Sequence, residues 1–236
     1  MNRPFEPEFI INILPELAPY LGVTLLTVVL TVVIGGFLGF LIAFAKIKGN
    51  KGFQLLADLF VYVLRATPSV VVLFIVFYGL PELLLNTVGI NTNDYNKLFF
   101  VVITFSLLFS ATISEVMRSA YEAVDQGQTE AALAVGLTGT QAFIRIVLPQ
   151  CIVTALPNFA NALVILLKEG ALAYTIGFID IMGKGILIIG SHYGANALET
   201  YLALALVYWG VTILLEKSFI MLEGKLSRGR KNIAAV

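Results

Sequence analysis

Long uninterrupted runs of apolar residues leave this chain very few possible folds. The first run extends from Tyr20 to Ala45, and further runs follow until Leu215. In a helix, about 20 consecutive apolar residues cross the roughly 30 Å hydrocarbon core of a bilayer. The composition agrees, because 58% of the residues are hydrophobic and 13% are charged, against about 45–50% and about 25% in soluble domains. We therefore expect an all-α, polytopic membrane protein with a single transmembrane domain over residues 1–236.

We expect about five membrane spans, at residues 20–45, 53–85, 98–121, 149–168 and 198–220. Lysines and arginines concentrate in KIKGNK after the first run, between Arg118 and Arg145, and in the C-terminal RGRK. Because short loops rich in these residues stay in the cytoplasm, the N-terminus is expected outside and the C-terminus inside. The segment between the loop and the tail must then cross an even number of times. The glycine-rich segment 171–190 is accordingly expected to be re-entrant or to lie on the outer face.

A segment with the composition of a soluble protein, residues 124–148, separates the third and fourth spans. Residues 128–135 are rich in alanine and end at Gly136, which predicts one short helix with a glycine cap. Thr138 and Gln141 fit a capping box, which predicts a second short helix. Two short helices with apolar faces suit insertion into a groove on a partner, and an amphipathic loop lying on the lipid surface explains the pattern equally well.

Several short motifs resemble those of one transporter family. Glu130-Ala131-Ala132, Gly136 and Ile146-x-Leu148-Pro149 resemble the EAA loop of ABC importer membrane subunits. Other segments resemble motifs of the polar amino-acid (histidine, glutamine and arginine) permease branch, namely Arg65-Ala66-Thr67-Pro68, Ser114-Glu115-Val116-Met117-Arg118 and Gly127-Gln128. The resemblance covers roughly residues 20 to 224. It departs at Lys168-Glu169-Gly170-Ala171-Leu172, where the branch carries K-x-T-S-L.

The resemblance implies a type I ABC importer permease, in the inner membrane of a prokaryote, that performs no chemistry itself. Its implied partners are two ATP-binding subunits, a second permease copy or a related permease, an extracytoplasmic solute-binding protein and an amino-acid solute. The residues expected to couple to the ATPase are Gln128, Glu130, Ala131, Ala132, Gly136 and Phe143. The partner would hold ATP and Mg, since the nearest approach to a P-loop, Gly177 to Gly185, has the wrong spacing.

No cofactor, metal or nucleic acid is expected on the chain itself. It has one cysteine, Cys151, and one histidine, His192, which together offer no metal cluster or catalytic pair. Its formal net charge is zero, so no basic bias favours nucleic acid. An ion-coupled secondary transporter and an intramembrane enzyme are the alternatives. A secondary transporter should show repeated spans, and an enzyme should show a group of catalytic residues. Neither feature is evident in the sequence.

Polar residues inside the spans indicate where a solute would bind, because they are costly in hydrocarbon and usually face a cavity. Glu115 and Arg118 lie one turn apart, so they can neutralise each other or face a solute. Pro68 should break the second span and free backbone groups there, although Arg65 could instead simply reach the lipid headgroups. The residues expected to bind substrate are Thr67, Glu115, Arg118, Asn158, Asn161, Ile165, Lys168 and Glu169. Glu115 and Glu169 favour a cationic amino acid such as arginine, histidine or lysine.

Gly35 and Gly39 form a small-residue pair in the first span. Such a pair allows the close approach of a neighbouring helix. Packing within the chain and a dimer interface explain the pair about equally well.

Overall fold

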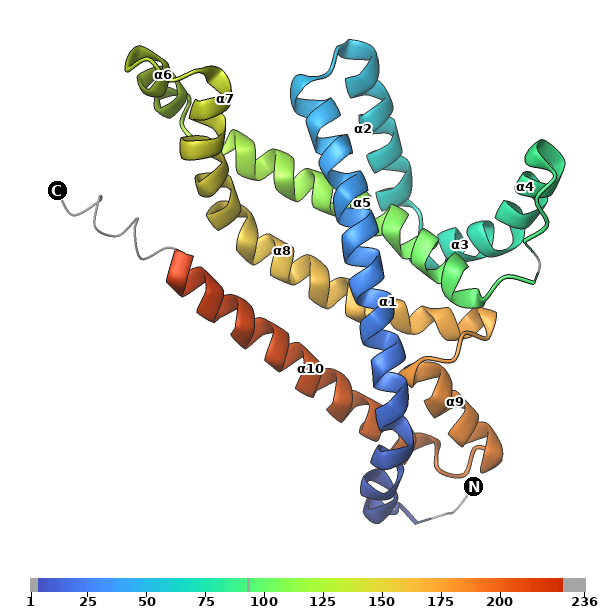
Figure 1. The fold of residues 1–236 in the computed structure, drawn as a ribbon. Coiled ribbons are helices and arrows are strands. Elements are labelled where there is room, and N and C mark those ends of the chain that lie inside the picture. Colours follow the sequence, from blue (N-terminus) through green and yellow to red (C-terminus); the bar gives the residue numbers. More distant parts are fainter. Residues whose placement is uncertain (1–3, 93, 227–236) are drawn as a thin grey trace.

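The structure, a computed structural model, describes residues 4–92 and 94–226 and is built from helices, with no strand in those ranges (Figure 1). The elements are α1 (Pro7–Lys48), α2 (Lys51–Ala66), α3 (Ser69–Phe74), η1 (Ile75–Gly79), α4 (Leu80–Val88), α5 (Lys97–Glu122), α6 (Gln126–Ala134), α7 (Gly139–Ala142), η2 (Phe143–Val147), α8 (Leu148–Gly170), η3 (Ala171–Ile176), α9 (Ile181–Ser191) and α10 (Ala197–Leu226). The RGRK segment, expected on the cytoplasmic side, lies outside the described residues.

Five helical segments of the described chain are long and apolar enough to cross a membrane. They are Pro7–Lys48, Ser69–Val88, Lys97–Glu122, Gly139–Ile176 and Ala197–Leu226. The predicted all-α fold with about five membrane helices is therefore confirmed. Segment 171–190 is formed by η3 and most of α9, and α9 is too short to be one of the five.

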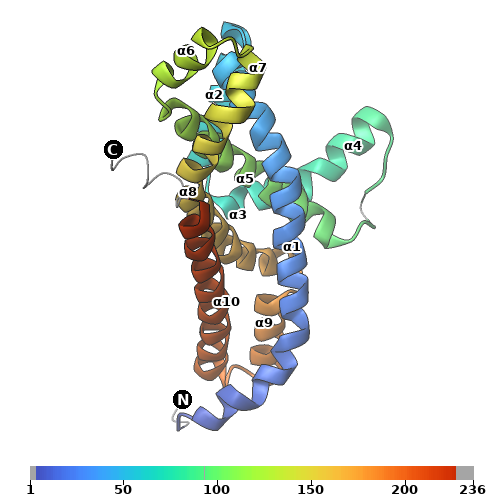
Figure 2. The ribbon, with the colours of Figure 1, turned by 60° about the vertical axis from the view of Figure 1, so that its left-hand side comes forward.

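The packing of α1 against α5 forms the centre of the fold (Figures 1 and 2). The buried face of α1 carries small residues at helical spacing, and these are Thr24, Thr27, Thr31, Gly35, Gly39 and Ala43. A Cβ atom added at Gly35 would lie 2.8 Å from the backbone oxygen of Ser106 on α5. At Gly39 an added Cβ would overlap Ile113. The Gly35–Gly39 pair thus serves close packing within the chain.

Helix α1 begins at Pro7, well before the first apolar run at Tyr20, and continues through Pro15 and Pro19. Prolines inside a helix normally destabilise it, because they remove a hydrogen bond and crowd the preceding turn. Here the first turns bury Ile13 and Leu17 in a cluster with residues of α9 and α10. This burial accounts for the helical conformation of a stretch that local sequence rules would exclude.

The second predicted span is broken where Pro68 predicts a break. Helix α2 ends at Ala66, and Thr67 adopts an extended conformation with φ −96° and ψ 131° before α3 begins at Ser69. The segment that is apolar enough to cross the membrane is Ser69–Val88, and α2 forms a separate helix. The ends of α2 and α3 therefore meet at the break.

Residues 124–148 form a projecting loop that contains both predicted short helices. Gly136 follows α6 with φ +89°, a conformation that glycine adopts without steric cost. Thr138 and Gln141 form both hydrogen bonds of the predicted capping box at the start of α7. We refer to residues 124–148 as the coupling loop.

At the opposite end of the molecule, Asp180 anchors α9 to α1. Its carboxylate accepts hydrogen bonds from the backbone N–H of Gly183 (2.9 Å) and the hydroxyl of Thr24 (3.2 Å). The side chain is buried, and burial raises the pKa of the Asp180 carboxyl above its ordinary value.

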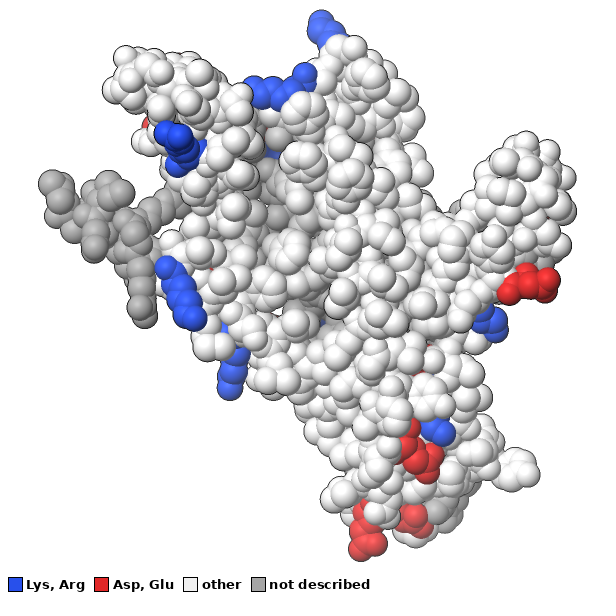
Figure 3. All heavy atoms as spheres, in the orientation of Figure 1, with Lys and Arg blue, Asp and Glu red and all other residues white. Residues whose placement is uncertain are grey.

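Charges are distributed unevenly along the molecule. On the face drawn in Figure 3, basic side chains lie at the end formed by α2 and the coupling loop and along α10, and acidic side chains gather mainly at the opposite end, where α1 begins, with one basic group among them. This is the asymmetry expected of a membrane protein whose basic end faces the cytoplasm.

Candidate functional site

A polar cavity of about 200 Å³ lies where the break after α2 meets α5 and α8. Its lining consists of Leu64, Arg65, Thr67, Ser69, Leu108, Phe109, Thr112, Ala162, Ile165, Leu166 and Glu169. Charged groups, hydroxyls and apolar side chains thus share one small volume between helices of a membrane protein. Such a mixture suits a small polar solute better than a lipid.

The broken helix brings polar groups to the cavity. Arg65 lies in the last turn of α2, Thr67 in the break and Ser69 at the start of α3. The Thr67 hydroxyl donates a hydrogen bond to the carbonyl of Val63 (2.7 Å), which leaves its oxygen lone pairs for another donor. From α5, the Thr112 hydroxyl donates to the Leu108 carbonyl at 3.3 Å in the same manner.

Arg65 and Glu169 are the charged side chains on this lining. They come from α2 and α8, so the two charges approach the cavity from different helices. Within the part of the chain that the structure describes, neither side chain forms an ion pair. Arg65 can bind the carboxylate of a zwitterion, and Glu169 can bind its ammonium group.

Glu115 and Arg118 lie in an ion-pair network away from the lining of the polar cavity. The Glu115 carboxylate pairs with Lys46 of α1 and with Arg118 (2.8 Å), and Arg118 also pairs with Glu122 (2.6 Å). Lys46 reaches Asp58 of α2 as well, at 2.7 Å. The network therefore links α1, α2 and α5 at the end that carries the coupling loop.

The residues of α8 that were expected to bind substrate divide between the cavity and the surface. Ile165 and Glu169 line the cavity, whereas Asn158, Asn161 and Lys168 are exposed on the helix. Arg65, Ser69, Phe109 and Thr112 also line the cavity, although none of them was among the residues expected to bind substrate. Thr112 could have been found as a polar residue one turn before Glu115 in an apolar span, but its position at the cavity depends on how α5 crosses α8.

The coupling loop exposes most of the residues expected to contact an ATPase. Gln128, Glu130, Ala131 and Gly136 are exposed, Ala132 is buried, and Phe143 is 39% exposed. Two apolar residues near the tip, Leu133 and Val135, are 48% and 79% exposed. An apolar tip on a projecting loop suits insertion into a partner's groove.

Comparison with known proteins shows the family to which the chain belongs. Residues 35–228 match the family described as "Binding-protein-dependent transport system inner membrane component". The L-cystine transport system permease protein TcyL of Bacillus subtilis is 38% identical over 236 residues, covering 100% of this chain and 98% of the relative. The arginine transport system permease protein ArtQ of the same organism is 33% identical over 202 residues, covering 86% and 88%.

A solved structure, described as an amino acid ABC transporter with histidines, has the same fold. It superimposes with a TM-score of 0.81 at 29% identity, covering 94% of this chain and 100% of that one. These matches define the chain as the membrane permease of an amino-acid ABC transporter, not an enzyme. It belongs to the family of binding-protein-dependent inner membrane transport components. Membership implies ATP-binding subunits and a solute-binding protein as partners.

Proposed function

We propose that the polar cavity is the site at which this permease holds a polar amino acid during ATP-driven import. The presence of Arg65 and Glu169, two opposite charges on one lining, carries the proposal. A free amino acid has a carboxylate that binds arginine or backbone N–H groups, and an ammonium group that binds a carboxylate. The solute carboxylate would therefore lie toward Arg65 and the start of the helix Ser69–Val88, and the ammonium toward Glu169.

Hydroxyl and aromatic groups would complete the site. Thr67, Ser69 and Thr112 offer acceptors and donors for a polar side chain, and Phe109 and Leu166 exclude water from it. Asn158, Asn161 and Lys168 continue along the exposed face of α8 and would guide the solute beyond the cavity. Glu115 and Arg118 would act indirectly, because their network positions the helices around the cavity.

Movement of the solute would be driven from the coupling loop. An ATP-binding subunit would receive α6 and α7, hold ATP and Mg itself, and move the spans as rigid bodies between outward and inward states. Two such subunits would serve two permease copies, so we infer a homodimer. The basic end of the molecule would face the cytoplasm, with the N-terminus outside and the C-terminus inside.

Equilibrium binding to the purified permease–ATPase complex tests the assignment of the cavity. The ligands are arginine, lysine, histidine, glutamine and cystine, and the variants are Arg65→Gln and Glu169→Gln. Each substitution should weaken binding about 10- to 100-fold, because a hydrogen bond to a charged group contributes about 1.5–3 kcal/mol. Lys168→Gln, next to Glu169 but outside the lining, is the matched control, because Lys168 would guide the solute beyond the cavity and should not change the affinity of the cavity itself. Equal affinities for all three variants and the wild type would refute the assignment.

The second candidate function is the selective transport of amino acids with a cationic side chain. The position of Glu169 on the cavity lining favours it. Among the described lining residues Glu169 is the acidic one, so a basic solute could place its side chain there. In that case Glu169→Gln would weaken the binding of arginine and lysine and leave glutamine and cystine unaffected. If Glu169 instead binds the α-ammonium group, all five ligands would weaken alike.

A further inference from the structure

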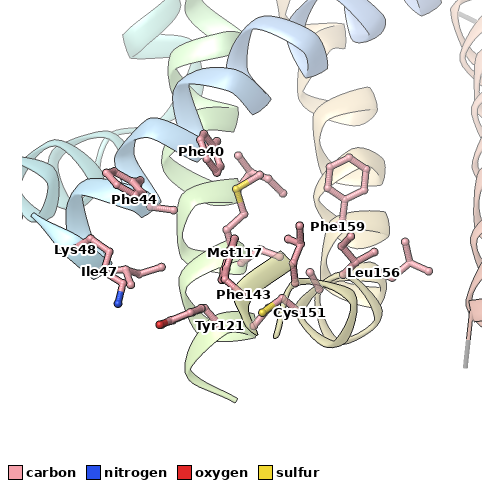
Figure 4. Close-up of a pocket in the computed structure, with 17 residues that line it drawn as sticks. Phe40, Phe44, Ile47, Lys48, Met117, Tyr121, Phe143, Cys151, Leu156 and Phe159 are labelled. Carbon is pink, nitrogen blue, oxygen red and sulfur yellow. The ribbon is translucent and has the colours of Figure 1, made fainter. Parts of the chain in front are cut away.

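A second cavity, of about 450 Å³, opens between α1, α5, α8 and η2 (Figure 4). Its walls are aromatic and aliphatic, with Phe44 from α1, Met117 from α5 and Phe159 from α8. Buried alanines, Ala43 and Ala120, lie on the lining and leave room where larger residues would fill the space. We call this cavity the apolar groove.

Polar groups on the apolar groove are confined to one end. In Figure 4 the nitrogen of Lys48 and the oxygen of Tyr121 lie at one end, and Phe40 and Phe159 lie at the other. The Lys48 Nζ atom lies 5.8 Å from the centre of the Tyr121 ring. In the described part of the chain Lys48 forms no ion pair, although the neighbouring Lys46 forms two. Lys48 is therefore a cation without an anionic partner among the described residues, and it lies at the polar end of a hydrocarbon-lined groove.

This chemistry excludes an amino-acid solute and matches an anionic lipid. The groove offers no partner for both charges of a zwitterion, and a charged solute there would lose its hydration without compensation. An acyl chain loses nothing in a hydrocarbon-lined groove, and a phosphate at its end gains a charge-assisted contact with an ammonium group. Lys48 is also the last residue of a membrane-crossing helix, Pro7–Lys48, and lipid headgroups are found at such helix ends.

We propose that the apolar groove binds one acyl chain of an anionic phospholipid, taken from the leaflet that borders the coupling loop, with the headgroup phosphate at Lys48. The lipid chain would pack between α1 and α8 against the floor formed by α5. It would also touch Phe143 of η2, which lines the groove and belongs to the coupling loop. Bound lipid would then support the joint between the coupling loop and the membrane helices.

Photocrosslinking tests the proposal on the whole permease–ATPase complex in nanodiscs. The probe is phosphatidylglycerol with a diazirine on its acyl chain, and the same probe with a phosphatidylcholine headgroup is compared. Adducts are mapped by mass spectrometry of peptides. Phosphatidylglycerol adducts should concentrate on groove residues such as Phe44, Met117 and Ile152, and should exceed the phosphatidylcholine adducts there.

Two variants and one control separate headgroup recognition from general lipid contact. Lys48→Gln should lower the groove adducts of phosphatidylglycerol about fivefold and leave those of phosphatidylcholine unchanged, since one basic residue contributes about that factor. Lys51→Gln removes an exposed lysine three residues later, outside the groove lining, and should change nothing. Ala155→Phe should fill the groove and remove adducts of both lipids. Each variant is compared only if it still co-purifies with the ATPase and binds solute.

Three outcomes would overturn the proposal. Adducts spread evenly over the apolar surface would show that the groove does not retain lipid. Equal groove adducts of the two lipids, insensitive to Lys48→Gln, would show that the headgroup is not recognised. Crosslinks from the groove to a second permease copy in place of lipid would show that protein fills it.

Discussion

Lys46, in the last turn of α1, forms an ion pair with Glu115 of α5. This ion pair joins the first and third membrane helices. Lys46 also pairs with Asp58 at 2.7 Å, so the same ammonium group holds α2. The Lys46 side chain is only 9% exposed. These ion pairs hold three helices together near the coupling loop.

Glu115→Gln should lower stability without changing solute affinity. The substitution removes the carboxylate that pairs with both Lys46 and Arg118, and each cation keeps only its more exposed partner, Asp58 or Glu122. Loss of the partly buried pairs should cost about 1–3 kcal/mol. The thermal unfolding midpoint of the complex and its affinity for arginine are measured together. Glu122→Gln is the control, because Glu122 pairs with Arg118 at an exposed position and should contribute about 0–1 kcal/mol. A large loss of arginine affinity in Glu115→Gln would place Glu115 in the solute site.

Gly35→Val should destabilise the packing of α1 on α5. Its Cβ atom would lie 2.8 Å from the Ser106 oxygen and 3.2 Å from the Phe109 ring, so the helices must separate. Overpacking of this kind costs about 1–3 kcal/mol. Gly36→Val is the matched control, since a Cβ there meets no atom within 4 Å. Equal unfolding midpoints for the two variants would contradict the close α1–α5 contact.

Gly136→Val should impair coupled transport while solute binding stays normal. The added Cβ meets no atom within 4 Å, but the positive φ of +89° is strained for valine and should distort the end of α6. ATP-dependent uptake into proteoliposomes is compared with equilibrium binding. Gly139→Val serves as the control, because Gly139 is equally open and lacks a positive φ. The role given to the Gly136 turn would fail if the two variants transported at the same rate.

Asp180→Asn and Asp180→Ala should differ in stability. Asparagine keeps one oxygen that accepts from the Gly183 N–H, its NH2 group can donate to the Thr24 hydroxyl oxygen, and the substitution removes a charge that burial disfavours. Alanine removes the cap of α9, which costs about 0.5–2 kcal/mol. In chemical unfolding of the purified complex, Asp180→Asn should therefore have a higher free energy of unfolding than Asp180→Ala. The reverse order would mean that the negative charge of Asp180 is itself required.

Local rules predicted the features that depend on neighbouring residues. Pro68 predicted the break before α3, Thr138 and Gln141 predicted the cap of α7, and the apolar runs predicted about five membrane helices. These outcomes follow from backbone geometry, capping chemistry and the thickness of a bilayer. None of them requires knowledge of which helices touch.

Features that arise from contacts between distant segments could not be predicted in this way. The sequence shows Lys46 as one of several lysines after the first span, and only the packing of α1 on α5 brings it to Glu115. Thr112 and Ser69 share a cavity because α3, α5 and α8 meet there. The start of α1 at Pro7 depends likewise on its burial against α9 and α10.

Site-specific photocrosslinking from Val135 tests the central claim most directly. Val135 is 79% exposed beside the Gly136 turn, and a photoreactive residue there probes the immediate surroundings of the coupling loop in native membranes. We predict a single strong adduct with an ATP-binding subunit. An equivalent probe at Tyr193, 98% exposed in the turn between α9 and α10, should not form it, because that turn lies at the far end of the molecule from the coupling loop (Figure 1). Adducts from Val135 with phospholipid alone would contradict the account.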